Sequence, residues 1–146
     1  MTMRDAKTPI VILETPYAGD IKQNLCYARA AMRDCLMRGE APYASHLLYT
    51  QDGVLNDDIP EERDHGIQAG FAFRAVATKT VVYDDLGISH GMRLGIEHSL
   101  EQGIPVEYRR LPEWARLRRS DEYIGTTRTP ETTTSGVLHY SERNSR

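Results

Sequence analysis

Side chains able to do chemistry follow three apolar segments of this sequence. A carboxylate, a hydroxyl and a phenol come soon after residues 9–13, a histidine lies near the end of residues 42–48, and adjacent aspartates follow residues 80–83. In chain order these candidates are Glu14, Thr15, Tyr17, Gly19, Asp20, His46, Asp84, Asp85 and Ser89. Carboxylates can act as nucleophiles or as acids and bases, and the ring of Tyr17 can stack on a flat ligand.

The elements that must position these residues alternate between strand and helix. Short apolar segments predict strands at residues 9–13, 42–48, 80–83 and 105–108, with helical periodicity between them. Such alternation favours parallel strands with helices on both faces of the sheet. The sequence therefore predicts an α/β fold, a three-layer sandwich with four or five mainly parallel strands.

Three helices have recognisable ends. Asp20 caps the first, which stops at Gly39; Pro60 opens the second; and Ser89 caps the third, which stops at Gly103. The apolar stripes expected to face the core are Ile21, Leu25, Ala28, Met32 and Leu36 in the first helix, Ile67, Phe71 and Ala75 in the second, and Met92, Ile96 and Leu100 in the third.

A ligand crevice is expected where the strands end. In doubly wound sheets it lies beyond the carboxyl ends of the strands, which would bring together the loops at 14–20, 45–57 and 84–91. The helix start at Ser89, His90 and Gly91 would offer backbone N–H groups to a phosphate. Neither G-x-G-x-x-G nor G-x-x-x-x-G-K-[ST] occurs, which argues against a standard dinucleotide or P-loop site.

Composition narrows the class of partner. The 146 residues carry a net charge of −3, which is typical of one soluble domain and argues against a dedicated binder of nucleic acid polymers or membranes. Cys26 and Cys35 lie nine residues apart on one expected helix, too far apart to pair. With no signal-peptide core visible, we expect a cytoplasmic location. The histidines show no zinc spacing, so neither a metal nor a cofactor is expected.

The ends of the chain differ from its middle. We expect an N-terminal extension at residues 1–8, one domain at 9–111 and a C-terminal segment at 112–146, which is Thr-rich from Thr126 to Thr134. That segment could be a loose solvated tail. Alternatively, it is an arm that crosses to a neighbouring subunit of a homo-oligomer. Its anchors would be Trp114, Tyr123, Val137, Leu138 and Tyr140.

Several short motifs occur in a recognisable order. They are Thr-Pro-Tyr-Ala-Gly-Asp at 15–20, Asn24 and Ala28, Gly39 to Pro42 with Ser45 to Leu48, Glu62-Arg63 with Gly66-Ile67, Ser89 to Arg93, and Gly103 to Val106. Over about residues 9–110 this set resembles the nucleoside 2-deoxyribosyltransferase-like superfamily, and within it a group of uncharacterised phage and bacterial domains.

The resemblance implies a flavodoxin-like or Rossmann-like sheet that binds a nucleoside or nucleotide. Active members cleave or exchange its N-glycosidic bond, which needs a carboxylate under the anomeric carbon. The expected ligand-binding residues are Thr15, Pro16, Tyr17, Gly19, Asp20, Asn24, His46, Asp85, Ser89, His90, Gly91, Met92 and Gly95.

One position departs from the pattern of active relatives. Their nucleophile is a Glu six residues after the Ser of the Ser-x-Gly motif, and here that position is Gly95. Glu97 does not replace it, because two residues along a helix turn the side chain by about 200°. We therefore expect a nucleotide-binding protein without the standard reaction. One version is a phage protein that sequesters a nucleotide-derived immune signal in the host cytoplasm.

Two alternatives stay open. The first is an N-glycosidic-bond enzyme, a deoxyribosyltransferase or nucleotide N-glycosidase, whose carboxylate has moved to Asp84, Asp85 or Glu14. A carboxylate that points into the space beside Gly95 would make this alternative the preferred one. The second is an interaction protein whose crevice is filled by its own side chains and binds no small molecule.

Overall fold

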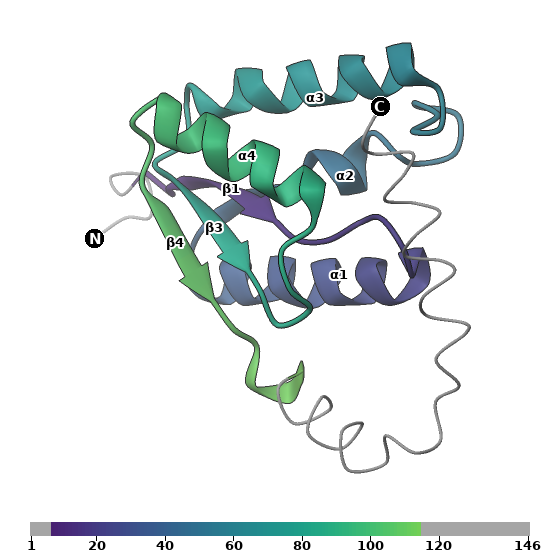
Figure 1. Cartoon of the computed structure of the whole chain (residues 1–146). Helices are drawn as coiled ribbons and strands as arrows, with labels where there is room; N and C mark the ends of the chain where they lie inside the picture. Colours follow the sequence, from purple (N-terminus) through teal and green to yellow (C-terminus); the bar gives the residue numbers. More distant parts are fainter. Residues whose placement is uncertain (1–6, 115–146) are drawn as a thin grey trace.

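The computed structural model describes residues 7–114, which form one four-stranded sheet between helices (Figure 1). The elements in chain order are β1 (Ile10–Glu14), α1 (Ile21–Met37), β2 (Ala41–Tyr43), α2 (Ser45–Leu48), α3 (Pro60–Arg74), β3 (Lys79–Tyr83), α4 (His90–Glu101) and β4 (Val106–Arg109). The predictions for residues 1–6 and 115–146, including the anchors Tyr123, Val137, Leu138 and Tyr140, lie outside the described residues.

The sheet is parallel throughout, with the strand order β2-β1-β3-β4. Figure 1 shows α1 on one face of the sheet and α3 and α4 on the other, with α2 beside α3. The predicted α/β three-layer sandwich is thus confirmed. Each crossover between parallel strands passes through a helix, as this kind of pairing requires.

Side-chain alternation divides the core between the two faces. Val11, Leu13 and Tyr83 belong to the buried cluster that includes Tyr27 of α1, whereas Val82 packs with Met92 and other residues on the α4 side. Successive residues of a strand point to opposite faces. Glu14, three residues after Val11, therefore projects towards the layer of α3 and α4.

The expected helix ends are present. The Asp20 carboxylate accepts a hydrogen bond from the Gln23 amide at 3.1 Å, and the Ser89 hydroxyl accepts one from the Met92 amide at 3.3 Å. Pro60 is the first residue of α3. Gly103 follows α4 with a φ of +71°, a conformation that glycine adopts without strain.

One predicted strand was too long. Residues 42–48 were expected to form it, but β2 ends at Tyr43 and Ser45–Leu48 form the short helix α2. The Leu48 and Tyr49 amides donate hydrogen bonds to the carbonyls of Ala44 and Ser45. A short apolar run fits either structure by pattern alone, and here packing of α2 against α3 favours the helix.

The predicted stripes on α1 and α4 were also wrong in part. Leu36 is 52% exposed and Leu100 is 64% exposed, while their neighbours Cys35 and Ser99 are completely buried. The buried face of α1 consists of Asn24, Tyr27, Ala28, Ala31 and Cys35. Polar partners explain the offset, because Asn24 donates to the carbonyls at 17 and 18 and therefore turns inward.

Two further features concern the class of protein. No helix among residues 7–114 is long and apolar enough to cross a membrane. Both cysteines are free: Cys26 is exposed and Cys35 is buried. Trp114, expected as an anchor if the C-terminal segment crosses to another subunit, packs edge-on against Tyr27 of its own chain, with ring centroids 5.0 Å apart.

Candidate functional site

A cleft lies on the α3 and α4 side of the sheet, at the carboxyl end of β1. We call it the inner cleft; residues of the loop after β1, α2, the loop before α3, α3 and the first half of α4 line it. Its volume is about 140 Å³. A cavity of similar size can hold one benzene ring, so the inner cleft is suited to a single ring of a ligand.

A second cavity opens beside the first. This outer cleft has a volume of about 570 Å³ and is lined by Tyr17, Ile21 and residues of the segment 50–62. Five residues line both cavities: Tyr17, Thr50, Leu55, Asp57 and Glu62. A ligand larger than one ring can therefore extend from the inner into the outer cleft.

The Glu14 carboxylate fills the space beside Gly95. A Cβ placed on Gly95 would lie 2.6 Å from Cδ of Glu14 and 2.6 Å from Nη2 of Arg74, and it would overlap Oε1 of Glu14. These distances are far below van der Waals contact, so only glycine fits at position 95 while both groups stay in place. The glycine thus makes room for a carboxylate and its partner.

Arg74 holds this carboxylate from α3. Its Nη2 donates to Oε1 of Glu14, and both side chains are largely buried. Its Nε donates to the Ser99 hydroxyl at 3.1 Å, and that hydroxyl donates to the Gly95 carbonyl at 2.9 Å. The guanidinium is therefore fixed between a strand and a helix, and it fixes one oxygen of Glu14.

Arg74 occupies only one of the two carboxylate oxygens of Glu14. Among residues 7–114, Oε2 receives no hydrogen bond, and Glu14 is one of the residues lining the inner cleft. Burial raises the pKa of Glu14 to about 7, although the charge of Arg74 and its hydrogen bond lower it. Near neutral pH this group can thus exist both as a nucleophilic carboxylate and as an acid.

A neutral histidine faces the same cleft. His46 Nε2 lies 2.6 Å from the Thr15 hydroxyl, and the Thr50 hydroxyl donates to the His46 carbonyl. Burial lowers the pKa of His46 to about 4. At neutral pH it carries no charge, so it can offer hydrogen bonds to a ligand but adds no positive charge.

The structure brings together only part of the predicted set. Residues of that set that line the inner cleft are Thr15, Tyr17, His46, Ser89, Gly91, Met92 and Gly95. Pro16, Gly19, Asp20, Asn24, Asp85 and His90 do not line it. Asn24 contributes indirectly. Its side-chain amide donates hydrogen bonds to the carbonyls of Tyr17 and Ala18 and so holds the loop that carries Tyr17.

Of the three candidate carboxylates, only Glu14 lines the inner cleft. Asp85 is buried on the α1 face, where it accepts hydrogen bonds from the Tyr27 hydroxyl at 2.7 Å and the Leu111 amide at 2.8 Å. Asp84 forms an ion pair with Arg110. Neither aspartate is a lining residue.

Arg74 was missed by the sequence interpretation. Gly70 follows Ile67 by three residues and Arg74 follows Gly70 by four, so all three share one face of the helix. An arginine on this inward face was a signal of a buried acidic partner that the sequence offered. Arg63, in the same helix, forms an ion pair with Asp57, with Nε and Oδ1 3.9 Å apart.

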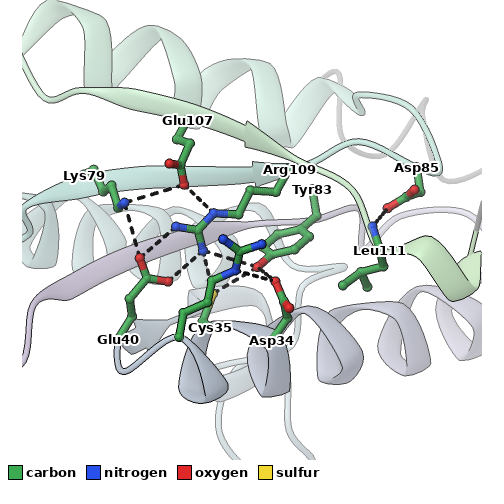
Figure 2. Close-up of polar contacts among 10 residues, drawn as sticks. Asp34, Cys35, Glu40, Lys79, Tyr83, Asp85, Glu107, Arg109 and Leu111 are labelled. Atoms are coloured by element: carbon green, nitrogen blue, oxygen red, sulfur yellow. Dashed lines mark hydrogen bonds and ion pairs between the residues drawn. The ribbon is translucent and has the colours of Figure 1, made fainter.

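A polar cluster on the opposite face is separate from the clefts. Figure 2 shows Arg109 between Glu40, Glu107 and Tyr83, with Cys35 and Asp34 below it. Both terminal nitrogens of Arg109 donate to the Glu40 carboxylate at 2.7 Å. None of these residues lines the inner or the outer cleft. They join β4 to the start of β2 and to α1.

Comparisons with other proteins give a family and nothing on activity. No curated protein and no solved structure matches the chain. Residues 9–109 match a domain of unknown function, DUF7768, which spans the whole sheet and both clefts. The chain therefore belongs to the DUF7768 family.

Proposed function

We propose that this protein acts on the N-glycosidic bond of a nucleoside or nucleotide, with Glu14 as the attacking carboxylate. The observation that carries the proposal is the position of the Glu14 carboxylate in the space beside Gly95. In deoxyribosyltransferase-like enzymes, which the sequence resembles, a Glu side chain at the position of Gly95 attacks the sugar. Here the carboxylate reaches the same region from β1 instead of α4.

The proposed reaction has two balanced steps. Oε2 of Glu14 attacks C1′ of the sugar, the bond from C1′ to the base breaks with its electron pair going to the base nitrogen, and the base takes up one proton from solvent. A water molecule or a second base then attacks C1′ of the glycosyl ester. That attack releases the Glu14 carboxylate, and the attacking molecule gives one proton to solvent.

The surroundings of Glu14 support this role. Arg74 binds Oε1 and so orients the carboxylate, and Oε2 receives no hydrogen bond from the described residues. The inner cleft accommodates one ring, and the aromatic residues Tyr17 and Tyr49 line it. Leu55, Ile67 and Met92 add apolar surface to the walls of the inner cleft.

A binding protein without turnover is the second candidate. The ion pair with Arg74 favours it, because a carboxylate bound to arginine is a weaker nucleophile than a solitary one. In that version the protein, as a homo-oligomer or alone, sequesters a nucleotide-derived signal in the cytoplasm of a phage-infected host. The two candidates differ in one measurable property, which is whether free base accumulates beyond one equivalent of protein.

The test is incubation of the full chain with nucleosides and nucleoside monophosphates, with and without a second base, followed by chromatography of the products. The enzyme proposal expects base release over many turnovers, lost by at least a hundredfold in Glu14→Gln. Asp84→Asn is the matched control, because Asp84 lies outside both clefts. Retention of intact compound with no release of base would leave the binding protein as the better account. Turnover that survives in Glu14→Gln would remove Glu14 as the nucleophile.

A further inference from the structure

The Ser99 hydroxyl is fully occupied by three hydrogen bonds. Ser99 is completely buried, and its hydroxyl donates its single proton to the Gly95 carbonyl at 2.9 Å. The oxygen accepts the Nε–H of Arg74 at 3.1 Å and lies 2.7 Å from the Thr80 hydroxyl. Because a hydroxyl has one proton and two acceptor positions, Thr80 is the donor in that last contact. Ser99 therefore keeps its orientation unless a buried hydrogen bond breaks.

Arg74 divides one edge of its guanidinium between two acceptors. The Nε–H and one Nη2–H of an arginine point the same way, and this edge commonly binds both oxygens of one carboxylate. Here Nη2 donates to Oε1 of Glu14, whereas Nε donates to the Ser99 hydroxyl. The guanidinium carbon also lies 5.4 Å from the centre of the Phe71 ring. Arg74 thus binds Glu14 at one point, where binding at two points would be usual.

Binding at two points would change the Glu14 carboxylate. A second charge-assisted hydrogen bond would stabilise its ionised form and engage both of its oxygens. Binding at one point avoids both effects, because Arg74 donates to Oε1 alone. The difference between the two arrangements depends on where the Nε–H of Arg74 finds its acceptor.

We infer that Ser99 is a positioning residue that keeps the Nε–H of Arg74 away from Glu14 and so preserves one carboxylate oxygen for reaction. The consequence for reaction rests on the proposed function, whereas the effect on the ion pair holds without it. Thr80 supports Ser99 from β3, and the Gly95 carbonyl takes its proton within α4. The segment of α4 that makes room for Glu14 therefore also restrains its arginine partner.

The titration of Glu14 reports on this arrangement. Burial raises its pKa to about 7, and Arg74 lowers it. Burial lowers the pKa of His46 to about 4, lowers that of His98 and raises that of Tyr43, so these neighbours on α2, α4 and β2 are mainly uncharged at pH 7. Arg74 is thus the charge through which a change at Ser99 reaches Glu14. Further titratable or charged side chains that line the inner cleft are Tyr17, Tyr49, Asp57, Glu62 and Arg63.

The experiment measures the pKa of Glu14 in the full chain and in Ser99→Ala, by NMR titration of the side-chain carboxyl carbon. Glu14→Gln identifies the resonance. Alanine deprives the buried Nε–H of its acceptor, and Oε2 of Glu14 is the acceptor that the same edge can reach. We expect the pKa of Glu14 to fall by about one pH unit or more. Base release from the nucleosides of the preceding test should slow at least tenfold, with little change in KM.

Two further variants separate positioning from a general loss of packing. Thr80→Val removes an equally buried hydroxyl, but the hydrogen bond from Arg74 to Ser99 remains, so the pKa of Glu14 should change by less than half as much. Ser99→Cys keeps a similar shape with a weaker acceptor and should lower the pKa by a smaller amount than alanine. It therefore gives the same test when Ser99→Ala folds poorly.

The outcomes separate this inference from the proposed function. A lower pKa of Glu14 in Ser99→Ala supports the inference. A pKa that stays the same or rises overturns it, because Ser99 would then only support Arg74, and so does an equal fall in Thr80→Val. These results do not require turnover, so a chain that releases no base overturns the reaction alone. A lower pKa with unchanged base release supports the inference and overturns Glu14 as the nucleophile.

Discussion

Glu14 and Gly95 occupy complementary positions: the carboxylate from β1 fills the volume that any side chain at position 95 would need. The Cδ atom of Glu14 lies 2.6 Å from the place of a Cβ on Gly95. A helix position without a side chain costs stability relative to alanine, by roughly 1 kcal/mol. At position 95 glycine is required, because the Glu14 carboxylate and the Arg74 guanidinium occupy the space that a side chain would need.

Gly95→Ala should therefore disturb the site more than the helix. The added methyl group would displace Glu14 and Arg74, so we expect a loss of about 1–3 kcal/mol in the free energy of unfolding and at least tenfold in nucleoside turnover or binding. For the change in stability, Gly91→Ala is the matched control on the same helix, since a Cβ there meets nothing within 4 Å. Denaturant titration of both variants checks the prediction. Equal behaviour of the two would show that the volume beside Gly95 is not restricted.

Replacing Arg74 should destabilise the fold, because the buried Glu14 carboxylate would lose its ion-pair partner. We expect Arg74→Met to lower the free energy of unfolding by about 3–5 kcal/mol, because Glu14 would lose its ion pair inside the protein. Adding Glu14→Gln should restore part of that loss. A double-mutant cycle by chemical denaturation measures the coupling. Coupling near zero would contradict the paired geometry.

The sequence predicted the scaffold better than the site. Alternating strands and helices, the caps at Asp20 and Ser89 and the parallel sheet depend on local patterns, and the structure confirms them. The boundary at Tyr43 was missed because Ser45–Leu48 carries no periodicity long enough to separate a helix from a strand.

The site required contacts between distant residues. Glu14, Arg74 and Gly95 come from three elements separated by dozens of residues, and no local pattern places them side by side. Strand parity directs Glu14 to the face opposite Val11 and Leu13, which pack with α1. The ion pairs of Arg74 with Glu14 and of Arg63 with Asp57 likewise depend on tertiary geometry, which no local sequence pattern gives.

Turnover should rise with pH through the pKa of Glu14. A nucleophilic carboxylate must be ionised, and burial raises the pKa of Glu14 to about 7. We expect kcat/KM to increase about tenfold per pH unit below 7 and to level off above it. Asp84→Asn should show the same profile. A rate that falls as the pH rises through 7 would indicate that Glu14 works as an acid instead.

His46 should make the fold sensitive to mild acid. Its pKa is about 4 in the folded chain and near 6.5 when unfolded, so its contribution to stability is complete above pH 6.5 and is lost as the pH falls through 4. The full contribution is at most about 3 kcal/mol. His46→Gln should flatten the fall in unfolding free energy between pH 6.5 and 4, as measured by urea titrations. His90→Gln, at an exposed position, should retain the slope of the unmodified chain. Identical slopes for all three proteins would rule out His46 as the buried group that titrates.

The polar cluster around Arg109 should protect the Cys35 thiol. Cys35 is completely buried, burial raises its pKa, and its sulfur lies 3.5 Å from the Tyr83 hydroxyl and 3.7 Å from Nη1 of Arg109. Cys26 is exposed. A thiol reagent should therefore label Cys26 quickly in the native chain and Cys35 only after unfolding.

Arg109→Met leaves the buried Glu40 carboxylate without its bidentate partner. Labelling of Cys35 should therefore become at least tenfold faster, as measured by mass spectrometry of each peptide. The exposed pair of Arg38 and Asp34 supplies the control: Arg38→Met should leave that rate within twofold, and a rate unchanged by Arg109→Met would mean that the cluster does not hold β4 against α1.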